Sequence, residues 1–135
     1  MQSVRRLLRT IGVNTNILAR AYLEDDKEQA EEVKKFLLLN TQENSLFISS
    51  YAILEFAWVL KTKNYTRNEI YEAIITLTDL IGIIVGQRNV VLEALEKYIK
   101  GRGDFGDYMI LAEGEKNKSY KLKTFDKVIQ KELSI

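Results

Sequence analysis

Short apolar runs alternate with longer helical patterns along this chain of 135 residues. The apolar runs predict four short strands, at residues 10–13, 46–48, 83–85 and 120–124. The remaining patterns predict helices at residues 15–23, 27–39, 51–63, 67–80, 88–100 and 105–116, and a last short helix that starts at Asp126. Short strands that alternate with helices pair in parallel, with helices on both faces of the sheet. We therefore expect an α/β fold with a central parallel sheet.

The length and the charge of the chain limit its organisation and its partners. A chain of 135 residues supports one hydrophobic core, so we expect one domain over residues 1–135 with its core at about 10–131. The 20 basic residues nearly balance the 19 acidic ones, so any nucleic-acid site must be a local patch. No apolar run approaches the ~18 residues of a membrane span. Residues 1–9 lack the pattern of a signal peptide, so we expect a cytoplasmic protein that does not enter a membrane.

The chain contains no Cys and no His. This absence excludes disulfides, zinc sites built from these residues, and nucleophiles activated by His. The polar chemistry must therefore come from carboxylates, amides, hydroxyls and cations. Clustered carboxylates favour hard cations such as Mg²⁺ or Mn²⁺.

Acidic and amide side chains lie at the ends of predicted strands and at the starts of predicted helices. Asn14 and Asp126 fall at strand ends, and ligands of parallel sheets bind beyond the carboxyl ends of the strands. Asp104 and Asp107 lie three positions apart at a helix start, so their carboxylates share one face. Glu55 lies inside an apolar helix, where a lone buried carboxylate would be costly. These five residues are the candidates for one polar site.

Each candidate also has a purely structural explanation. Asn14, Asp104 and Asp126 are good helix N-caps, and Asp107 in a first turn interacts favourably with the helix dipole. Glu55 fits equally well as an outward-pointing side chain or as the partner of an arginine. Capping explains these residues one at a time, but it does not explain why they gather at one edge of the predicted sheet.

Four short segments carry a resemblance to a known family: residues 13–18 with Asn14, 50–60 with Glu55, 103–107 with Asp104 and Asp107, and 122–127 with Asp126. In this order and at these spacings, the chain resembles the PIN domain, and within that family the VapC-type toxins of bacterial and archaeal toxin–antitoxin pairs. The resemblance runs from about residue 11 to residue 131. It implies a three-layer α/β/α domain with a central parallel sheet of four to five strands, the fifth missing or reduced to residues 133–135. It also implies an endoribonuclease that depends on Mg²⁺ or Mn²⁺.

The resemblance assigns roles to individual residues. Asn14 stands where the family has its first catalytic Asp, and Glu55, Asp104 and Asp107 match the other catalytic acids. These four side chains and that of Asp126 are then the expected metal ligands. Three further polar residues are expected to support the site: Thr15, Asn16 and Thr124.

Asparagine in place of aspartate at position 14 keeps the shape of the side chain and removes one negative charge. We expect much weaker metal binding and little or no RNA cleavage by this chain. The substitution is either a deliberate change that inactivates a toxic ribonuclease or a natural change in an inactive relative. The intact acids at the other positions favour a deliberate change.

Residues 116–131 contain six lysines and one aspartate, a local net charge of +5. This segment is suited to guide RNA phosphates toward the site, with Lys121, Lys123 and Lys127 as the predicted contacts. A solvated surface near the chain end explains the lysines almost as well.

The resemblance further implies a homodimer and a VapB-type antitoxin that blocks the site. Trp58, Tyr65 and Tyr71 are candidates for a partner surface, because aromatic residues are enriched at interfaces. Core packing also explains these three residues.

Two other functions fit parts of the pattern. A catalytically silent RNA-binding or regulatory PIN domain is favoured by Asn14 and disfavoured by the intact acids elsewhere in the site. A phosphoacceptor receiver domain needs an acidic pair directly after its first strand and an Asp after its third. Here Asp25 and Asp26 follow a whole helix, and Gly86 ends the third strand, so this function fits poorly.

Overall fold

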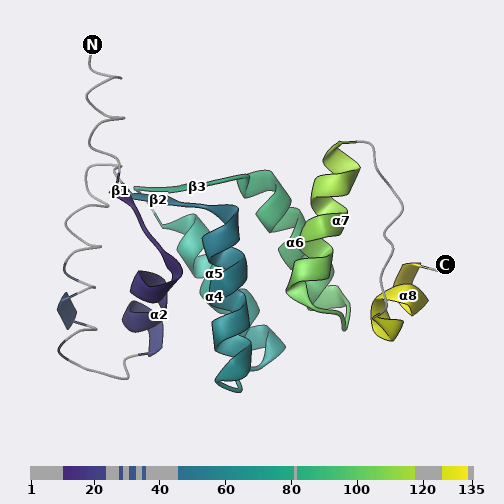
Figure 1. Ribbon diagram of the computed structural model, residues 1–135, viewed down its shortest axis with the longest axis horizontal. Helices are drawn as coiled ribbons and strands as arrows, with labels where there is room; N and C mark the ends of the chain where they lie inside the picture. The colour runs from purple at the N-terminus through teal and green to yellow at the C-terminus, as the bar shows by residue number, and fades with distance from the viewer. Residues whose placement is uncertain are drawn as a thin grey trace, which may run out of the picture.

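The computed structural model describes residues 11–23, 28, 31–32, 35, 46–80, 82–117 and 126–133 of the chain. Within these residues the fold is α/β, as the sequence predicts, with a small parallel sheet (Figure 1). The strands are β1 (Ile11–Gly12), β2 (Leu46–Ile48) and β3 (Ile83–Val85), in the order β1-β2-β3. The register places Leu46 of β2 between Ile11 of β1 and Ile83 of β3.

The described sheet has three strands, fewer than the four to five that the sequence predicts. The predictions for β2 and β3 are confirmed to the residue, whereas β1 is shorter than the predicted strand at 10–13. Val13 still continues the ladder, because its N–H donates to the carbonyl oxygen of Phe47 at 2.9 Å. The predicted strand at 120–124 lies outside the described residues, so the larger strand count stays a prediction.

The helices of the described part are α2 (Thr15–Leu23), α4 (Ser50–Thr62), α5 (Arg67–Asp79), α6 (Arg88–Lys100), α7 (Phe105–Lys116) and α8 (Lys127–Leu133). The ends of α2, α4, α5, α6 and α7 agree with the predicted helices to within one residue, and α8 starts one residue after the predicted Asp126. α4 starts at Ser50 because Ser49 caps it, with its hydroxyl oxygen accepting the N–H of Ala52 at 3.0 Å. Of the helix predicted at 27–39, residues 28, 31, 32 and 35 are helical and the others lie outside the described residues.

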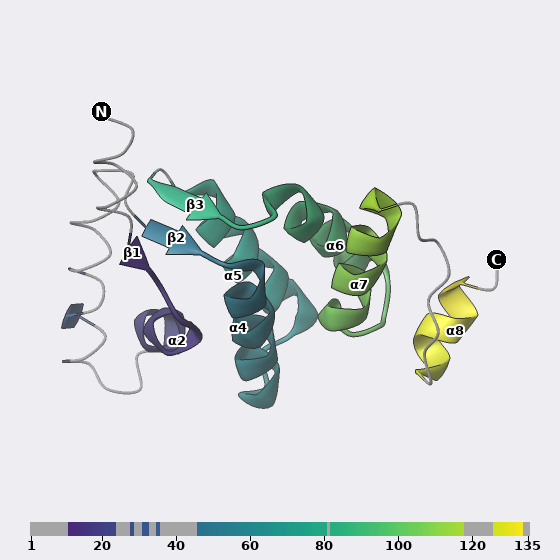
Figure 2. The same ribbon diagram turned by 45° about the horizontal axis from the view of Figure 1, so that its top comes forward.

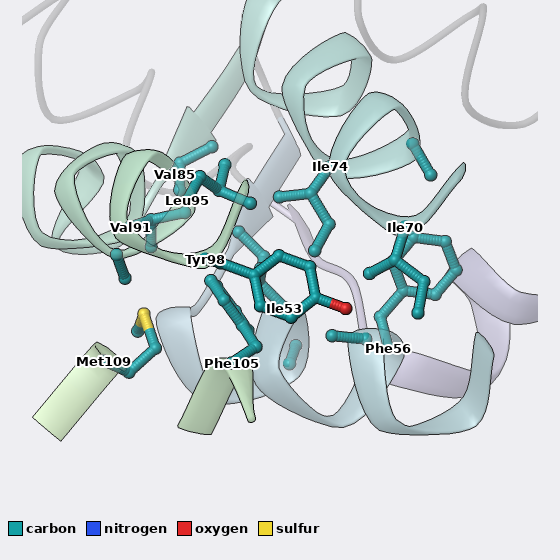
Figure 3. Close-up of a cluster of buried hydrophobic side chains, with 14 of the residues drawn as sticks. Ile53, Phe56, Ile70, Ile74, Val85, Val91, Leu95, Tyr98, Phe105 and Met109 are labelled. Atoms are coloured by element: carbon teal, nitrogen blue, oxygen red, sulfur yellow. The ribbon is translucent and has the colours of Figure 1, made fainter. Parts of the chain in front are cut away.

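One cluster of buried apolar side chains joins the sheet to the helices (Figure 3). Leu46 and Ile48 of β2 are fully buried in it. Figure 3 shows helix side chains that converge on this cluster: Ile53 and Phe56 of α4, Ile70 and Ile74 of α5, Leu95 and Tyr98 of α6, and Phe105 and Met109 of α7. Tyr98 and Phe105 pack edge to face with their ring centres 5.7 Å apart, so the start of α7 is held against α6.

The helices that follow β1 and β2 lie side by side. At the start of α2, the hydroxyl of Thr15 donates to the carbonyl oxygen of Ala52 in α4 at 3.4 Å. In both ribbon views, α4 lies between α2 and α7 (Figure 1, Figure 2). α4 therefore has one side toward α2 and another toward α7. Among the described helices, none combines the length and the apolar character that crossing a membrane requires.

Candidate functional site

A groove of about 1130 Å³ lies between α4 and α7. Its α4 wall includes Tyr51, Glu55, Trp58 and Lys61. Its other wall includes residues at and near the start of α7: Arg102, Asp104, Phe105, Asp107 and Ile110. The groove thus brings together three of the predicted acids, one from α4 and two from the start of α7.

Three carboxylates converge where α7 and α8 begin. Asp104, Asp107 and Asp126 each offer one oxygen, and these oxygens lie within 4.8 Å of one another. Asp104 is the N-cap residue of α7, yet its side chain makes no capping hydrogen bond. Asp126 does cap α8, because one of its oxygens accepts the N–H groups of Val128 at 2.9 Å and Ile129 at 3.2 Å. Capping therefore explains the position of the Asp126 carboxylate but not that of Asp104.

The carboxylates of this cluster repel one another. Burial, and then the negative charges of Asp126 and Asp104, raise the pKa of Asp107. Lys61 forms an ion pair with Asp104 and supplies one positive charge, whereas no recorded ion pair within the described residues reaches Asp107. Like charges held this close favour a bound proton or a bound cation. The cluster therefore has the electrostatic character of a cation site.

The donor set fits a hard divalent cation. Mg²⁺ takes carboxylate and water oxygens at about 2.1 Å, so oxygens on opposite sides of the ion lie about 4.2 Å apart. The carboxylate oxygens of Asp104, Asp107 and Asp126 lie within 4.8 Å of one another, so no two of them are much farther apart than opposite ligands of Mg²⁺. Thiolate and imidazole donors are absent from the whole chain, which leaves oxygen ligands only.

Arg67 of α5 holds the loop that leads into Asp104. Its guanidinium donates to the carbonyl oxygen of Gly103 at 2.7 Å and to that of Tyr98 at 2.5 Å. The same group lies 3.9 Å from the centre of the Tyr98 ring, a cation–π contact. These contacts position the backbone directly before the carboxylate cluster.

Tyr108 and Glu132 fasten α8 to the same loop. The hydroxyl of Tyr108 donates to one carboxylate oxygen of Glu132 at 2.5 Å and accepts the N–H of Gly103 at 2.9 Å. The other carboxylate oxygen of Glu132 accepts the N–H of Arg102 at 2.9 Å. A Cβ at Gly103 would lie 2.0 Å from Cδ1 of Ile129, so glycine is needed for this close docking. The docking of α8 brings Asp126 to the other two carboxylates.

The sequence patterns do not single out Arg67, Tyr108 or Glu132 as residues that shape the site. The one local signal is the pair of glycines that flank Arg102, which indicates a close approach of backbone and side chains. The side chains that exploit this approach come from three different helices.

Two of the predicted site residues, Glu55 and Asn14, lie apart from the three-carboxylate cluster. Glu55 is exposed on the groove wall and is not a member of the cluster. Asn14 caps α2, because its side-chain oxygen accepts the N–H of Ile17 at 3.1 Å. Asn14 is not among the residues that line the groove, since α4 lies between α2 and α7 (Figure 2).

The predicted supporting and RNA-contacting residues are only partly described. Thr15 is bonded to α4, and Asn16 is exposed on α2. Lys127 is exposed in the first turn of α8, next to Asp126. Thr124, Lys121 and Lys123 lie outside the described residues.

The aromatic residues suggested for a partner surface differ in exposure. Trp58 is 66% exposed. Tyr65 and Tyr71 are half-buried and pack against the core, which agrees with their structural explanation.

A comparison with protein families matches residues 11–133 to the PIN domain. The chain belongs to the PIN domain family. No curated protein and no solved structure matches it. PIN domains are generally nucleases that use divalent metal ions and bind nucleic acid. The carboxylate cluster beside α7 is a position in this PIN domain where such an ion fits.

Proposed function

We propose that this PIN domain is a Mg²⁺- or Mn²⁺-dependent endoribonuclease of the VapC toxin type, weakened or silenced by Asn14. The observation that carries the proposal is the convergence of Asp104, Asp107 and Asp126 beside a groove that Glu55 also lines. Stability alone favours separating such charges rather than gathering them. In this proposal residues 1–135 form one three-layer domain, and the predicted strand at 120–124 extends the sheet to four strands.

The chemistry of phosphodiester hydrolysis assigns a task to each side chain. A bound divalent ion supplies charge neutralisation at the phosphate and a lower pKa for the attacking water. Asp104 and Asp107 would hold the ion, and Asp126 would hold it or orient a water. Glu55, on the α4 wall, would orient a water or contact the ion through one. Lys61 can exchange Asp104 for a phosphate oxygen, since both partners are anionic and the Lys61–Asp104 pair is exposed.

Asn14 lowers the proposed activity because an amide carries no charge and binds a cation more weakly than a carboxylate. Its oxygen also accepts the N–H of Ile17 as a helix cap, a role that aspartate fills equally well. The reversion Asn14→Asp therefore restores the charge without disturbing α2. Because Asn14 caps α2 and does not line the groove, this reversion is also the sharpest test of whether it acts at the catalytic centre.

The test compares cleavage of a mixed RNA pool by this chain, by Asn14→Asp and by Asn14→Asp combined with Asp104→Asn, each with Mg²⁺ or Mn²⁺. We expect cleavage by the reversion alone and its loss in EDTA. Asn89→Asp is the matched control, because it adds the same charge at an exposed position in the first turn of α6, outside the groove. Silence of every variant across a range of RNAs would contradict the nuclease proposal.

A catalytically silent RNA-binding or regulatory PIN domain is the second candidate. Two observations favour it: the missing charge at Asn14, and the ion pair by which Lys61 already balances Asp104. RNA binding that is unaffected by EDTA, together with a silent reversion, is the result that this function predicts.

The proposed partners are RNA, a VapB-type antitoxin and a second copy of this chain. Exposed Trp58 supports a partner surface on α4. Light scattering of the purified chain measures the homodimer directly, and a monomer at all concentrations would contradict that part of the proposal.

A further inference from the structure

The three clustered carboxylates belong to two parts of the chain that are anchored separately. Asp104 and Asp107 lie in one segment at the start of α7, where the side chains of Phe105 and Tyr108 are buried. Asp126 directly precedes α8, which both ribbon views place at one end of the molecule, beyond α7 (Figure 1, Figure 2). The distance from Asp126 to the other two carboxylates therefore depends on how α8 docks.

α8 docks through few contacts. Of its seven residues, Ile129 is buried, Glu132 is half-buried and the other five are exposed. Isolated helices shorter than about 12 residues are marginal in water, so α8 depends on its contacts with the loop before α7. Ile129 packs directly against Gly103. The carboxylate of Glu132 accepts the hydroxyl of Tyr108 at 2.5 Å and the N–H of Arg102 at 2.9 Å, and we call these two hydrogen bonds the α8 latch.

The charges of the cluster oppose this docking. When α8 docks, Asp126 brings a third carboxylate to within 4.8 Å of those of Asp104 and Asp107. Like charges repel at this separation, so the α8 latch holds Asp126 in place against a repulsion. The three carboxylates lose this repulsion when they share a divalent cation. Cation binding and the docking of α8 should therefore favour each other, each by the same factor.

We propose that the α8 latch positions Asp126 for the cation, so that Glu132 and Tyr108 set the affinity of the site without being ligands. The proposal rests on the proposed metal-dependent function and assigns positioning roles to two residues outside the three-carboxylate cluster. Tyrosine is uncharged at neutral pH, so Tyr108 acts through the docking of α8 and not by attracting the cation. A chain with α8 undocked keeps two of the three carboxylates together and binds the cation more weakly.

Hydrogen exchange of the α8 amides tests the linkage without any measurement of activity. The exchange is followed by mass spectrometry with and without saturating Mn²⁺, in this chain and in Asn14→Asp. We expect Mn²⁺ to slow the exchange of α8 by about fivefold or more, because the cation holds the docked state. The end of α5, at residues 77–80, does not line the groove and should exchange at an unchanged rate. A latch with a purely structural role would protect α8 equally in both conditions.

Substitutions in the latch separate positioning from charge. Tyr108→Phe removes the hydroxyl and no charge, whereas Glu132→Ala removes both hydrogen bonds, and each should weaken Mn²⁺ binding by about tenfold or more in titration calorimetry. Glu132→Gln loses the same charge as Glu132→Ala but keeps an oxygen for the N–H of Arg102, so its loss should be smaller. Tyr71→Phe is the matched control, because Tyr71 is half-buried on α5 and does not line the groove. Far-UV circular dichroism checks that each variant is folded.

Unchanged Mn²⁺ affinity in Tyr108→Phe, with equal losses in Glu132→Ala and Glu132→Gln, would assign the effect to charge and overturn the latch. Exchange of α8 that does not respond to bound Mn²⁺ would overturn it as well, and so would the absence of Mn²⁺ binding in both this chain and Asn14→Asp. The cleavage assay of Asn14→Asp separates the two proposals. Cleavage with an unresponsive α8 refutes only the latch, whereas a responsive α8 without cleavage supports the latch and contradicts the nuclease.

Discussion

Lys61 forms an ion pair with Asp104, one of the carboxylates proposed to hold a divalent cation. The two side chains are 61% and 57% exposed, and ion pairs this exposed contribute only about 0–1 kcal/mol to stability. We expect Lys61→Met to change the free energy of unfolding by less than about 1 kcal/mol and to tighten Mn²⁺ binding by up to about fivefold. Titration calorimetry with Mn²⁺ measures the affinity. Lys63→Met, which removes the same charge two residues away, is the control, and equal affinities of the two variants would contradict the competition.

The repulsion within the carboxylate cluster acts on the pKa of Asp107. Burial, and then Asp126 and Asp104, raise its pKa above the ordinary value of 3.8. A carboxyl with a raised folded-state pKa destabilises the folded state once it is ionised, so this penalty grows as pH rises through the two pKa values and is fully present at neutral pH. We therefore expect Asp107→Asn to raise the melting temperature at pH 7 in metal-free buffer, and the gain to shrink as pH falls toward 4.

Calorimetry over a series of pH values checks the Asp107 prediction. Glu72→Gln, which removes an exposed carboxylate outside the cluster, is the control. A melting temperature that falls in Asp107→Asn at pH 7 would show that this carboxylate stabilises the metal-free fold.

At the scale of helices and strands, local signals predicted the elements well. α7 is an example, because the spacing of Phe105, Tyr108 and Met109 predicts an inward face, and the helix begins directly after Asp104 as the sequence predicts. All three of these side chains are buried. Such patterns depend only on neighbours within a few residues, which is why their prediction from sequence succeeds.

The arrangement of the candidate site was less predictable, because it depends on pairs that are distant in sequence. Lys61 and Asp104 are 43 positions apart, and Tyr108 and Glu132 are 24 positions apart. No periodic pattern encodes which of many surface lysines meets which carboxylate. The sequence therefore identified the acids as candidates. The packing of α4, α7 and α8 decides that Asp104, Asp107 and Asp126 form the cluster and that Glu55 lies outside it.

The contact between α7 and α8 makes a prediction at this scale. Tyr108→Phe leaves the N–H of Gly103 and the carboxylate of Glu132 without their hydroxyl partner, which should cost about 1–3 kcal/mol. Denaturant titration measures this loss. Tyr51→Phe removes an exposed hydroxyl and should stay within about 0.5 kcal/mol of the parent chain.

The same hydroxyl gives the contact a pH dependence. Burial, and then the hydrogen bond to Glu132, raise the pKa of Tyr108 above its ordinary value of 10.0. Because the folded-state pKa is the higher one, the stabilisation is complete below pH 10 and is lost as pH rises through the folded-state value. The stability difference between the parent chain and Tyr108→Phe should therefore shrink above pH 10. A difference that grows there would contradict the proposed donor role of the hydroxyl.

At the scale of the whole molecule, one continuous core connects the sheet to the groove. The buried cluster runs from Leu46 of β2 through Ile53 of α4 and Leu95 of α6 to Ile129 of α8. The groove walls are thus the outer faces of helices whose inner faces share this core. Loss of packing anywhere in this buried apolar cluster should therefore destabilise the groove and the carboxylate cluster.

Ile74→Ala tests this continuity, because Ile74 is fully buried on α5 and does not line the groove. Such a truncation should lower the free energy of unfolding by about 2–5 kcal/mol. If the described residues unfold as one cooperative unit, Trp58 fluorescence and far-UV circular dichroism must shift to the same lower denaturant midpoint. Leu80→Ala, at an exposed position of the same region, should change stability by less than about 0.5 kcal/mol. Two separate midpoints in Ile74→Ala would mean that α4 and the groove melt independently of the rest, and that the carboxylate cluster is supported by local contacts such as those of Arg67 rather than by the core.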